Sequence, residues 1–214
     1  FKNAAISHIC TQNLAISKKI SIISNIQTIE TNYKSLFGKV DCIILAKDDI
    51  ENNHKIITYF IKKKIPIFVD KQLASNFLRL KNIITQINKQ NNYLFFSGSC
   101  LKYSKKITEI KKVVKKQDII RIEAFTKLNW IAYSQHVLDP INEYFNYKCK
   151  FEYQKSETKN RFKKKIYFKL NKKINLNINL NTNCKKIYMI FVLKNKKKYK
   201  ITLDDYHYSF KKTL

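Results

Sequence analysis

Apolar residues in the first half of the chain form short continuous runs separated by longer amphipathic stretches. Residues 41–46, Asp-Cys-Ile-Ile-Leu-Ala, form one such run, which is typical of a strand buried on both faces of a sheet. Comparable runs predict strands at residues 4–9, 65–69 and 93–96.

The stretches between these runs carry apolar residues at helical spacing. One predicted helix presents Ile56, Ile57, Phe60 and Ile61, and the next presents Phe77, Leu80, Ile84 and Ile87. Strands that alternate with helices predict an α/β domain, built as a Rossmann-like parallel sheet with helices on both faces.

The pattern changes near residue 117. A strand is predicted at residues 118–125 and a helix at residues 137–145. Further strands follow without helices between them, at residues 162–170, 174–180, 187–193 and 199–203. Successive strands of this kind predict an open antiparallel sheet with one covered and one exposed face. We therefore expect two domains, residues 1–100 and an α+β domain over residues 101–214.

The formal net charge of +28 raises the question of a nucleic-acid partner. Lys, Asn and Ile are abundant while the chain has only 2 Gly and 2 Pro, which is the composition expected of an A/T-biased genome. A dedicated nucleic-acid binder would use more Arg, because Arg makes bidentate contacts to bases and phosphates. We therefore expect no nucleic-acid partner, and a basic nucleic-acid-associated protein is the less favoured alternative.

The 5 cysteines have no spacing typical of a metal site, and no metal is expected. They are expected to be reduced thiols of a cytoplasmic protein. No apolar run approaches the roughly 20 residues that span a bilayer, so no membrane partner is expected.

Three segments carry polar side chains where chemistry is expected. Val-Asp-Lys-Gln-Leu-Ala, residues 69–74, spans the end of a predicted strand, where open α/β sheets bind ligands. Phe-Phe-Ser-Gly-Ser, residues 95–99, is followed by Leu-Lys-Tyr, and Trp130 to Pro140 contains a His followed three residues later by an Asp. In their order and spacing these segments resemble the Gfo/Idh/MocA oxidoreductases.

This resemblance implies a partial dinucleotide-binding domain followed by a substrate and oligomerisation domain. It also implies hydride transfer between NAD or NADP and a secondary alcohol of a sugar, nucleotide-sugar or polyol. The implied catalytic residues are Lys71 and His136. The implied cofactor contacts are Ala46, Lys47, Asp48, Asp70 and Lys71, and the implied substrate contacts are Lys102, Tyr103, Tyr133 and Asp139.

The residue types suit this chemistry. A histidine with a pKa near neutrality can take the hydroxyl proton, which gives His136 the proton-transfer role. A lysine beside the hydroxyl can orient it and stabilise developing negative charge, which is the role implied for Lys71. The exposed face of the second sheet makes a homo-oligomer a further expectation.

The sequence also departs from the family. The G-x-G-x-x-G turn that holds a pyrophosphate is absent, since the only glycines are Gly38 and Gly98. Residues 4–9 correspond to the family's second strand, so we expect an N-terminally truncated chain without its first βα unit. Thr11 and Gln12 replace the acid that would bind the ribose, Gln72 replaces a usual Pro, and Ala132 replaces a frequent Asp. The alternative is therefore a non-catalytic binding or regulatory relative of the same fold.

Overall fold

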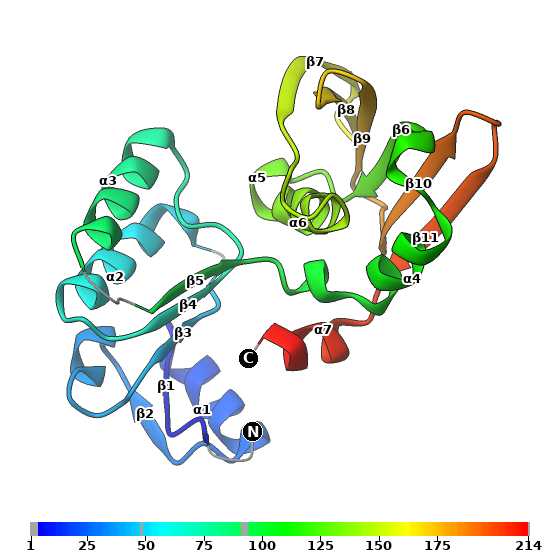
Figure 1. Cartoon of the computed structure of the whole chain (residues 1–214). Helices are drawn as coiled ribbons and strands as arrows, with labels where there is room; N and C mark the ends of the chain where they lie inside the picture. The colour runs from blue at the N-terminus through cyan, green and yellow to red at the C-terminus, as the bar shows by residue number, and fades with distance from the viewer. Residues whose placement is uncertain (1–3, 48, 91–93, 214) are drawn as a thin grey trace. The chain divides into compact units, whose positions relative to one another are not determined.

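The structure is a computed structural model that describes residues 4–47, 49–90 and 94–213. The chain divides into two compact units, residues 1–97 and residues 98–214, near the boundary predicted between residues 100 and 101 (Figure 1). Each unit has its own hydrophobic core.

The first unit alternates strands and helices. Its elements are β1 (His8–Cys10), α1 (Leu14–Ser24), β2 (Thr28–Glu30), the 3-10 helix η1 (Tyr33–Leu36), β3 (Ile43–Leu45), α2 (Ile50–Lys62), β4 (Ile67–Asp70), α3 (Phe77–Asn88) and β5 (Phe95–Gly98). β1 and β2 pair in parallel, and so do β3 and β4, whose sheet continues in the order β3-β4-β5. The expected βα alternation with parallel pairing is confirmed.

The core of the first unit confirms the face predicted for α2. Ile57, Phe60 and Ile61 are fully buried and share a cluster with Val69 of β4. The face predicted for α3 is wrong in part. Phe77 is 74% exposed and Ile84 is 45% exposed, whereas the neighbouring Ile83 is buried. Leu80, Ile83 and Ile87 have the same helical spacing, and with two adjacent isoleucines the sequence alone could not show which one faces the sheet.

The second unit is built around one large sheet. Its elements are η2 (Cys100–Tyr103), α4 (Lys105–Val113), η3 (Lys116–Asp118), β6 (Ile119–Thr126), α5 (Trp130–Tyr133), α6 (Gln135–Tyr144), β7 (Phe151–Asn160), β8 (Lys163–Leu170), β9 (Ile174–Asn181), β10 (Ile187–Leu193), β11 (Lys198–Leu203) and α7 (Tyr206–Thr213). The strand order is β11-β10-β6-β9-β8-β7.

This sheet is mixed rather than purely antiparallel. β6 pairs in parallel with β9, while its other neighbour, β10, is antiparallel to it. The parallel pair arises because α5 and α6 follow β6 and carry the chain to the far edge, where β7 and β8 precede β9. The sequence did not predict β7, since its side chains are almost all polar and lack the alternation that marks a half-buried strand.

One face of the sheet is covered, as expected. Ile174, Leu176, Ile178 and Leu180 of β9 are buried, while the asparagines that alternate with them are more exposed. Val137, Ile141 and Tyr144 of α6 belong to the same core cluster as these β9 residues. Helix α6 is therefore anchored on the covered face, and this fixes the side chains at its first turn.

Tyr144 provides a test of this anchoring. Its buried hydroxyl donates a hydrogen bond of 2.6 Å to the Val114 carbonyl, and burial raises the pKa of Tyr144 to about 12. Tyr144→Phe leaves that carbonyl without this donor, and we expect a loss of about 1–3 kcal/mol in the free energy of unfolding, measured in urea at neutral pH. The exposed Tyr153→Phe is the matched control and should change stability little.

The pKa of Tyr144 also predicts a pH dependence. Unfolded tyrosine has a pKa of about 10, so the folded value is raised and the neutral form is favoured in the native state. The contribution of Tyr144 is therefore fully present below about pH 10 and is lost as the pH rises through the folded pKa. Identical alkaline unfolding curves for the wild type and Tyr144→Phe would contradict this interpretation.

Candidate active site

In the first unit, the residues implied as cofactor contacts lie where β3 and β4 end. Ala46 and Lys47 follow β3, Asp70 is the last residue of β4, and Lys71 comes next. Because β3 and β4 are parallel, these carboxyl ends lie at the same edge of the sheet, which is where open α/β sheets bind ligands. The remaining expected contact, Asp48, lies outside the described residues.

Lys71 has an unusual backbone. Its φ of 73° is in the left-handed region, which costs a non-glycine residue about 1–3 kcal/mol. The Ser97 hydroxyl on β5 donates a 2.8 Å hydrogen bond to the Lys71 carbonyl and so holds this conformation. Within the described residues, the other non-glycine residues with positive φ lie at helix ends or hairpin turns: Asn25, Lys64, Asn146, Tyr147, Asn171, Lys172 and Lys196. Lys71 instead follows a strand of a parallel sheet, at the carboxyl edge of that sheet.

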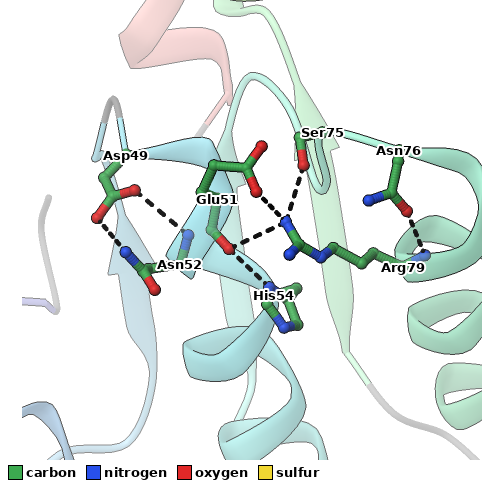
Figure 2. Close-up of polar contacts among 7 residues, drawn as sticks. All are labelled: Asp49, Glu51, Asn52, His54, Ser75, Asn76 and Arg79. Atoms are coloured by element: carbon green, nitrogen blue, oxygen red, sulfur yellow. Dashed lines mark hydrogen bonds and ion pairs between the residues drawn. The ribbon is translucent and has the colours of Figure 1, made fainter.

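The loop after β3 is fixed by the start of α2. Asp49 caps this helix and accepts hydrogen bonds from the backbone and side-chain nitrogens of Asn52, at 3.3 and 2.8 Å (Figure 2). Lys47 Nζ lies 2.9 Å from the Asp49 carboxylate. The hydrogen bonds from Asn52 and Lys47 hold the pKa of Asp49 below its usual range. The buried Asn53 amide donates to the Lys47 carbonyl at 3.1 Å, so both ends of this loop are anchored.

The loop after β4 is tied to the same helix. Arg79 of α3 forms an ion pair with Glu51 of α2, and its guanidinium also donates to Ser75 Oγ at 3.0 Å (Figure 2). Hydrogen bonds from Ser75 and Arg79 lower the pKa of Glu51. Asn76 caps α3 by accepting from the Arg79 backbone at 3.0 Å. Both loops at this edge are therefore tied to the first turn of α2 by separate polar contacts. The sequence did not predict the contact between Glu51 and Arg79, because these residues lie 28 positions apart in the chain.

In the second unit, His136 lies in the first turn of α6 and is only 6% exposed. Its Nδ1 is 2.6 Å from the hydroxyl of Ser99, which is 0% exposed. The Tyr133 ring lies 6.0 Å from the imidazole, and the Tyr206 ring lies 6.5 Å away at a nearly perpendicular 88°. One hydroxyl and two aromatic rings thus lie beside the implied base.

Lys102 is buried and Asp139 is half-buried beside the same segment. The Asp139 carboxylate accepts a 2.7 Å hydrogen bond from the Ser99 backbone nitrogen. Burial raises the pKa of Asp139, against the opposing effects of this hydrogen bond and of the Lys102 charge. Burial also lowers the pKa of Lys102, against the attraction of Asp139 and Glu143. In both groups desolvation outweighs the attraction between the charges, as in many buried ion pairs.

Gly98 allows these two side chains to approach the backbone. Its φ is 137°, and an added Cβ would lie 2.8 Å from Asp139 Oδ2 and 3.2 Å from Lys102 Nζ. We expect Gly98→Ala to lower the free energy of unfolding by about 1–3 kcal/mol, because the strained backbone and the displaced carboxylate both oppose the native state. Denaturant unfolding followed by circular dichroism measures this change.

Gly38→Ala is the matched control. Gly38 also has a positive φ, 77°, but an added Cβ there would meet nothing within 4 Å. This variant reports the strain of a positive φ without crowding, and we expect a larger loss in Gly98→Ala because crowding and a φ of 137° act there together. Equal losses in the two variants would show that this crowding has no energetic consequence.

The structure gathers the expected residues into two sets, each within its own unit. The first unit holds Ala46, Lys47, Asp70 and Lys71, and the second holds Lys102, Tyr103, Tyr133, His136 and Asp139. Lys102 Nζ lies 5.2 Å from the Tyr103 ring centre, and Lys127 Nζ lies 5.3 Å from the Tyr133 ring centre.

Sequence reasoning missed three side chains: Ser97, Ser99 and Tyr206. Both serines belong to the Ser-Gly-Ser segment that the sequence singled out, but their hydrogen-bond partners lie 26 and 37 residues away. Tyr206 gave no signal in the sequence.

Two negative findings concern the described part of the chain. Within residues 4–47, 49–90 and 94–213, no group of three His, Cys, Asp or Glu residues could hold a metal ion. No helix in these same ranges is long and apolar enough to cross a membrane.

Comparison with curated sequences gives a weak match. No protein-family model matches the chain. It is 26% identical over 172 residues to GTPase Era from Ureaplasma urealyticum serovar 10, a match that covers 70% of this chain and 56% of that protein. GTPase Era from Ureaplasma parvum serovar 3 gives the same identity and coverage. A phosphate loop of the type G-x-x-x-x-G-K-[ST] is absent from the 214 residues, whose only glycines are Gly38 and Gly98.

Comparison with solved structures identifies the fold. A dehydrogenase (MviM) from Clostridium difficile has a TM-score of 0.72 at 21% identity, covering 90% of this chain and 67% of that one. Myo-inositol 2-dehydrogenase from Lactobacillus plantarum has a TM-score of 0.79 at 13% identity, covering 94% and 69%. Scyllo-inositol dehydrogenase from Lactobacillus casei, with NAD(H) and scyllo-inositol, has a TM-score of 0.76 at 11% identity, covering 92% and 68%. At the level of the fold, these structures confirm the resemblance to the Gfo/Idh/MocA oxidoreductases.

Proposed function

We propose that this chain is an oxidoreductase that transfers a hydride between NAD or NADP and a secondary alcohol of a sugar, nucleotide-sugar or polyol. The observation that carries the proposal is Lys71, which is held in a strained left-handed conformation at the carboxyl end of β4. Strain of this kind gathers at sites of function, where the surrounding structure maintains it. One solved dehydrogenase of similar fold, scyllo-inositol dehydrogenase from Lactobacillus casei, has NAD(H) and scyllo-inositol bound.

The edge formed by β3 and β4 suits the nicotinamide half of such a cofactor. Ala46, Lys47, Asp70 and Lys71 would lie along it, and the lysines are compatible with an anionic ligand. A bound nicotinamide supplies the hydride acceptor. The glycine turn that would cradle the pyrophosphate is absent from the 214 residues, so the site held by these residues is partial.

The protein's side chains orient the substrate and transfer the proton. Lys71 orients the substrate hydroxyl and stabilises the negative charge that develops on its oxygen during oxidation. His136 accepts the hydroxyl proton and returns it in the reverse direction. Lys102, Tyr103, Tyr133 and Asp139 are proposed as substrate-side residues.

A non-catalytic binding relative is the second candidate, and Thr11 favours it. Thr11 stands where an acid would bind the cofactor ribose. Its hydroxyl instead donates to the Asn13 carbonyl at 2.7 Å and lies 2.8 Å from Ser17 Oγ. Because the Thr11 hydroxyl is already hydrogen-bonded at the start of α1, it contributes little to binding a ribose.

Cofactor reduction tests the proposal. The 214-residue chain is assayed as it stands, and again with any coding sequence that precedes Phe1, against NAD and NADP. The substrates are myo-inositol, scyllo-inositol, a panel of sugars and a panel of nucleotide-sugars, and absorbance of the reduced nicotinamide is the readout. We expect turnover with one substrate class. Cofactor binding by calorimetry without turnover in either form would favour the binding relative, and neither binding nor turnover would reject both.

A further inference from the structure

We propose that Ser99 is the positioning residue for His136, holding the imidazole through Nδ1 so that proton exchange with a substrate takes place at Nε2. This inference rests on the proposed function for the role of His136, while the contact between the two side chains stands independently of it. The resemblance to known oxidoreductases did not assign a role to Ser99.

The contact is short and buried. Ser99 Oγ lies 2.6 Å from His136 Nδ1, with the serine fully enclosed and the histidine nearly so. A hydrogen bond in surroundings that exclude water is stronger than one at the surface, because solvent neither screens it nor competes for its donors. This hydroxyl, together with the aromatic rings of Tyr133 and Tyr206, restricts the orientation of the ring.

Ser99 is itself immobilised by its neighbours. Its backbone nitrogen donates to Asp139 at 2.7 Å, and its carbonyl accepts from the Lys102 nitrogen at 3.3 Å. Its hydroxyl also accepts from the Leu101 nitrogen at 3.2 Å. Asp139 follows His136 by one helical turn, so Ser99 is tied to α6 at two successive turns. The backbone of Ser99 is thus fixed beside α6, and its hydroxyl cannot rotate away from the ring without losing the bond from the Leu101 nitrogen.

The chemistry of a hydroxyl suits a histidine that both takes and gives a proton. A serine hydroxyl has two lone pairs and one proton, and the Leu101 N–H occupies one lone pair. The remaining lone pair accepts from the Nδ1–H group, and this leaves Nε2 of the neutral ring bare and able to take a proton. A carboxylate in the same place could only accept and would favour the charged ring. Nδ1 keeps its proton and its bond to Ser99 whether the ring is neutral or charged, so Nε2 is the nitrogen through which the proton passes.

Nitrogen NMR of the full chain tests the positioning directly. Histidine labelled with ¹⁵N on both ring nitrogens reports the tautomer and hydrogen bonding of each ring, and His136→Gln assigns the His136 signals among the four histidines. We expect Ser99→Ala to shift the Nδ1 signal of His136 and to change its tautomer populations. Ser156→Ala, which removes an exposed hydroxyl of β7 in the same unit, should leave them unchanged.

Turnover adds a readout that a merely structural role would not produce. With Ser99→Ala we expect kcat to fall by about three- to tenfold with little change in KM, since one hydrogen bond to the ring is lost. Ser99→Thr keeps the hydroxyl on an extended backbone that threonine tolerates, and it should restore both kcat and the Nδ1 signal.

The two readouts keep this inference distinct from the proposed function. An unchanged His136 spectrum in a folded Ser99→Ala chain overturns the positioning role, whatever happens to activity. A changed spectrum in a chain that shows no turnover with any substrate supports the role of Ser99 and leaves the oxidoreductase proposal as the part that failed.

Discussion

His136→Ala is expected to lower kcat/KM by about 10²–10⁴-fold, which is the usual contribution of a positioned acid–base residue. Lys71→Ala is expected to cost about 10²–10³-fold, comparable to the loss of one group that stabilises a developing oxyanion. Initial rates of cofactor reduction, measured on the substrate class that the panel identifies, give both values. The two losses have separate causes, since one variant removes the proton acceptor and the other removes a positive charge.

Each variant has a matched control in the same chain. Lys64→Ala removes an exposed lysine whose backbone is also left-handed, with a φ of 58° against 73° for Lys71, so it reproduces both the charge change and the backbone strain. His207→Ala removes an exposed histidine of α7. We expect both controls to retain full turnover. If Lys71→Ala and His136→Ala also retain it, the assignment of the two catalytic residues is wrong.

Phe60→Ala is expected to produce the largest loss of stability, about 3–5 kcal/mol in the free energy of unfolding of the first unit. Phe60 is fully buried in α2, and its ring meets those of Tyr59 and Tyr33 edge-on, at 5.1 and 6.2 Å between centres. Truncation removes these contacts and leaves a cavity that a packed core can only partly close. Hydrogen exchange of the α2 and β4 amides, followed by mass spectrometry, measures the effect.

Phe77→Ala makes the same chemical change at a residue of α3 that is 74% exposed. We expect it to alter the exchange of the same amides very little. A similar loss in the two variants would mean that the core of the first unit does not depend on Phe60. Such a result would also contradict the buried face that the sequence predicts for α2.

The sequence predicted the elements whose signal is local. The bounds expected for β10, residues 187–193, agree with the structure, and so does the buried face of α2. In both cases side-chain burial follows the repeat of one strand or helix, which can be read without knowing its neighbours. The sequence predicted the position of Lys71 directly after a strand for the same reason, because a buried apolar run ends there.

Only the tertiary structure decided the contacts between distant parts of the chain. The parallel pairing of β6 with β9 depends on the path taken through α5, α6, β7 and β8, which no local repeat encodes. The support of His136 by Ser99 and the close approach of Asp139 to Gly98 depend on how α6 packs in the second unit. Local periodicity thus indicated the buried face of α2 and the bounds of β10, whereas the partners of the polar side chains were set by packing between elements far apart in sequence.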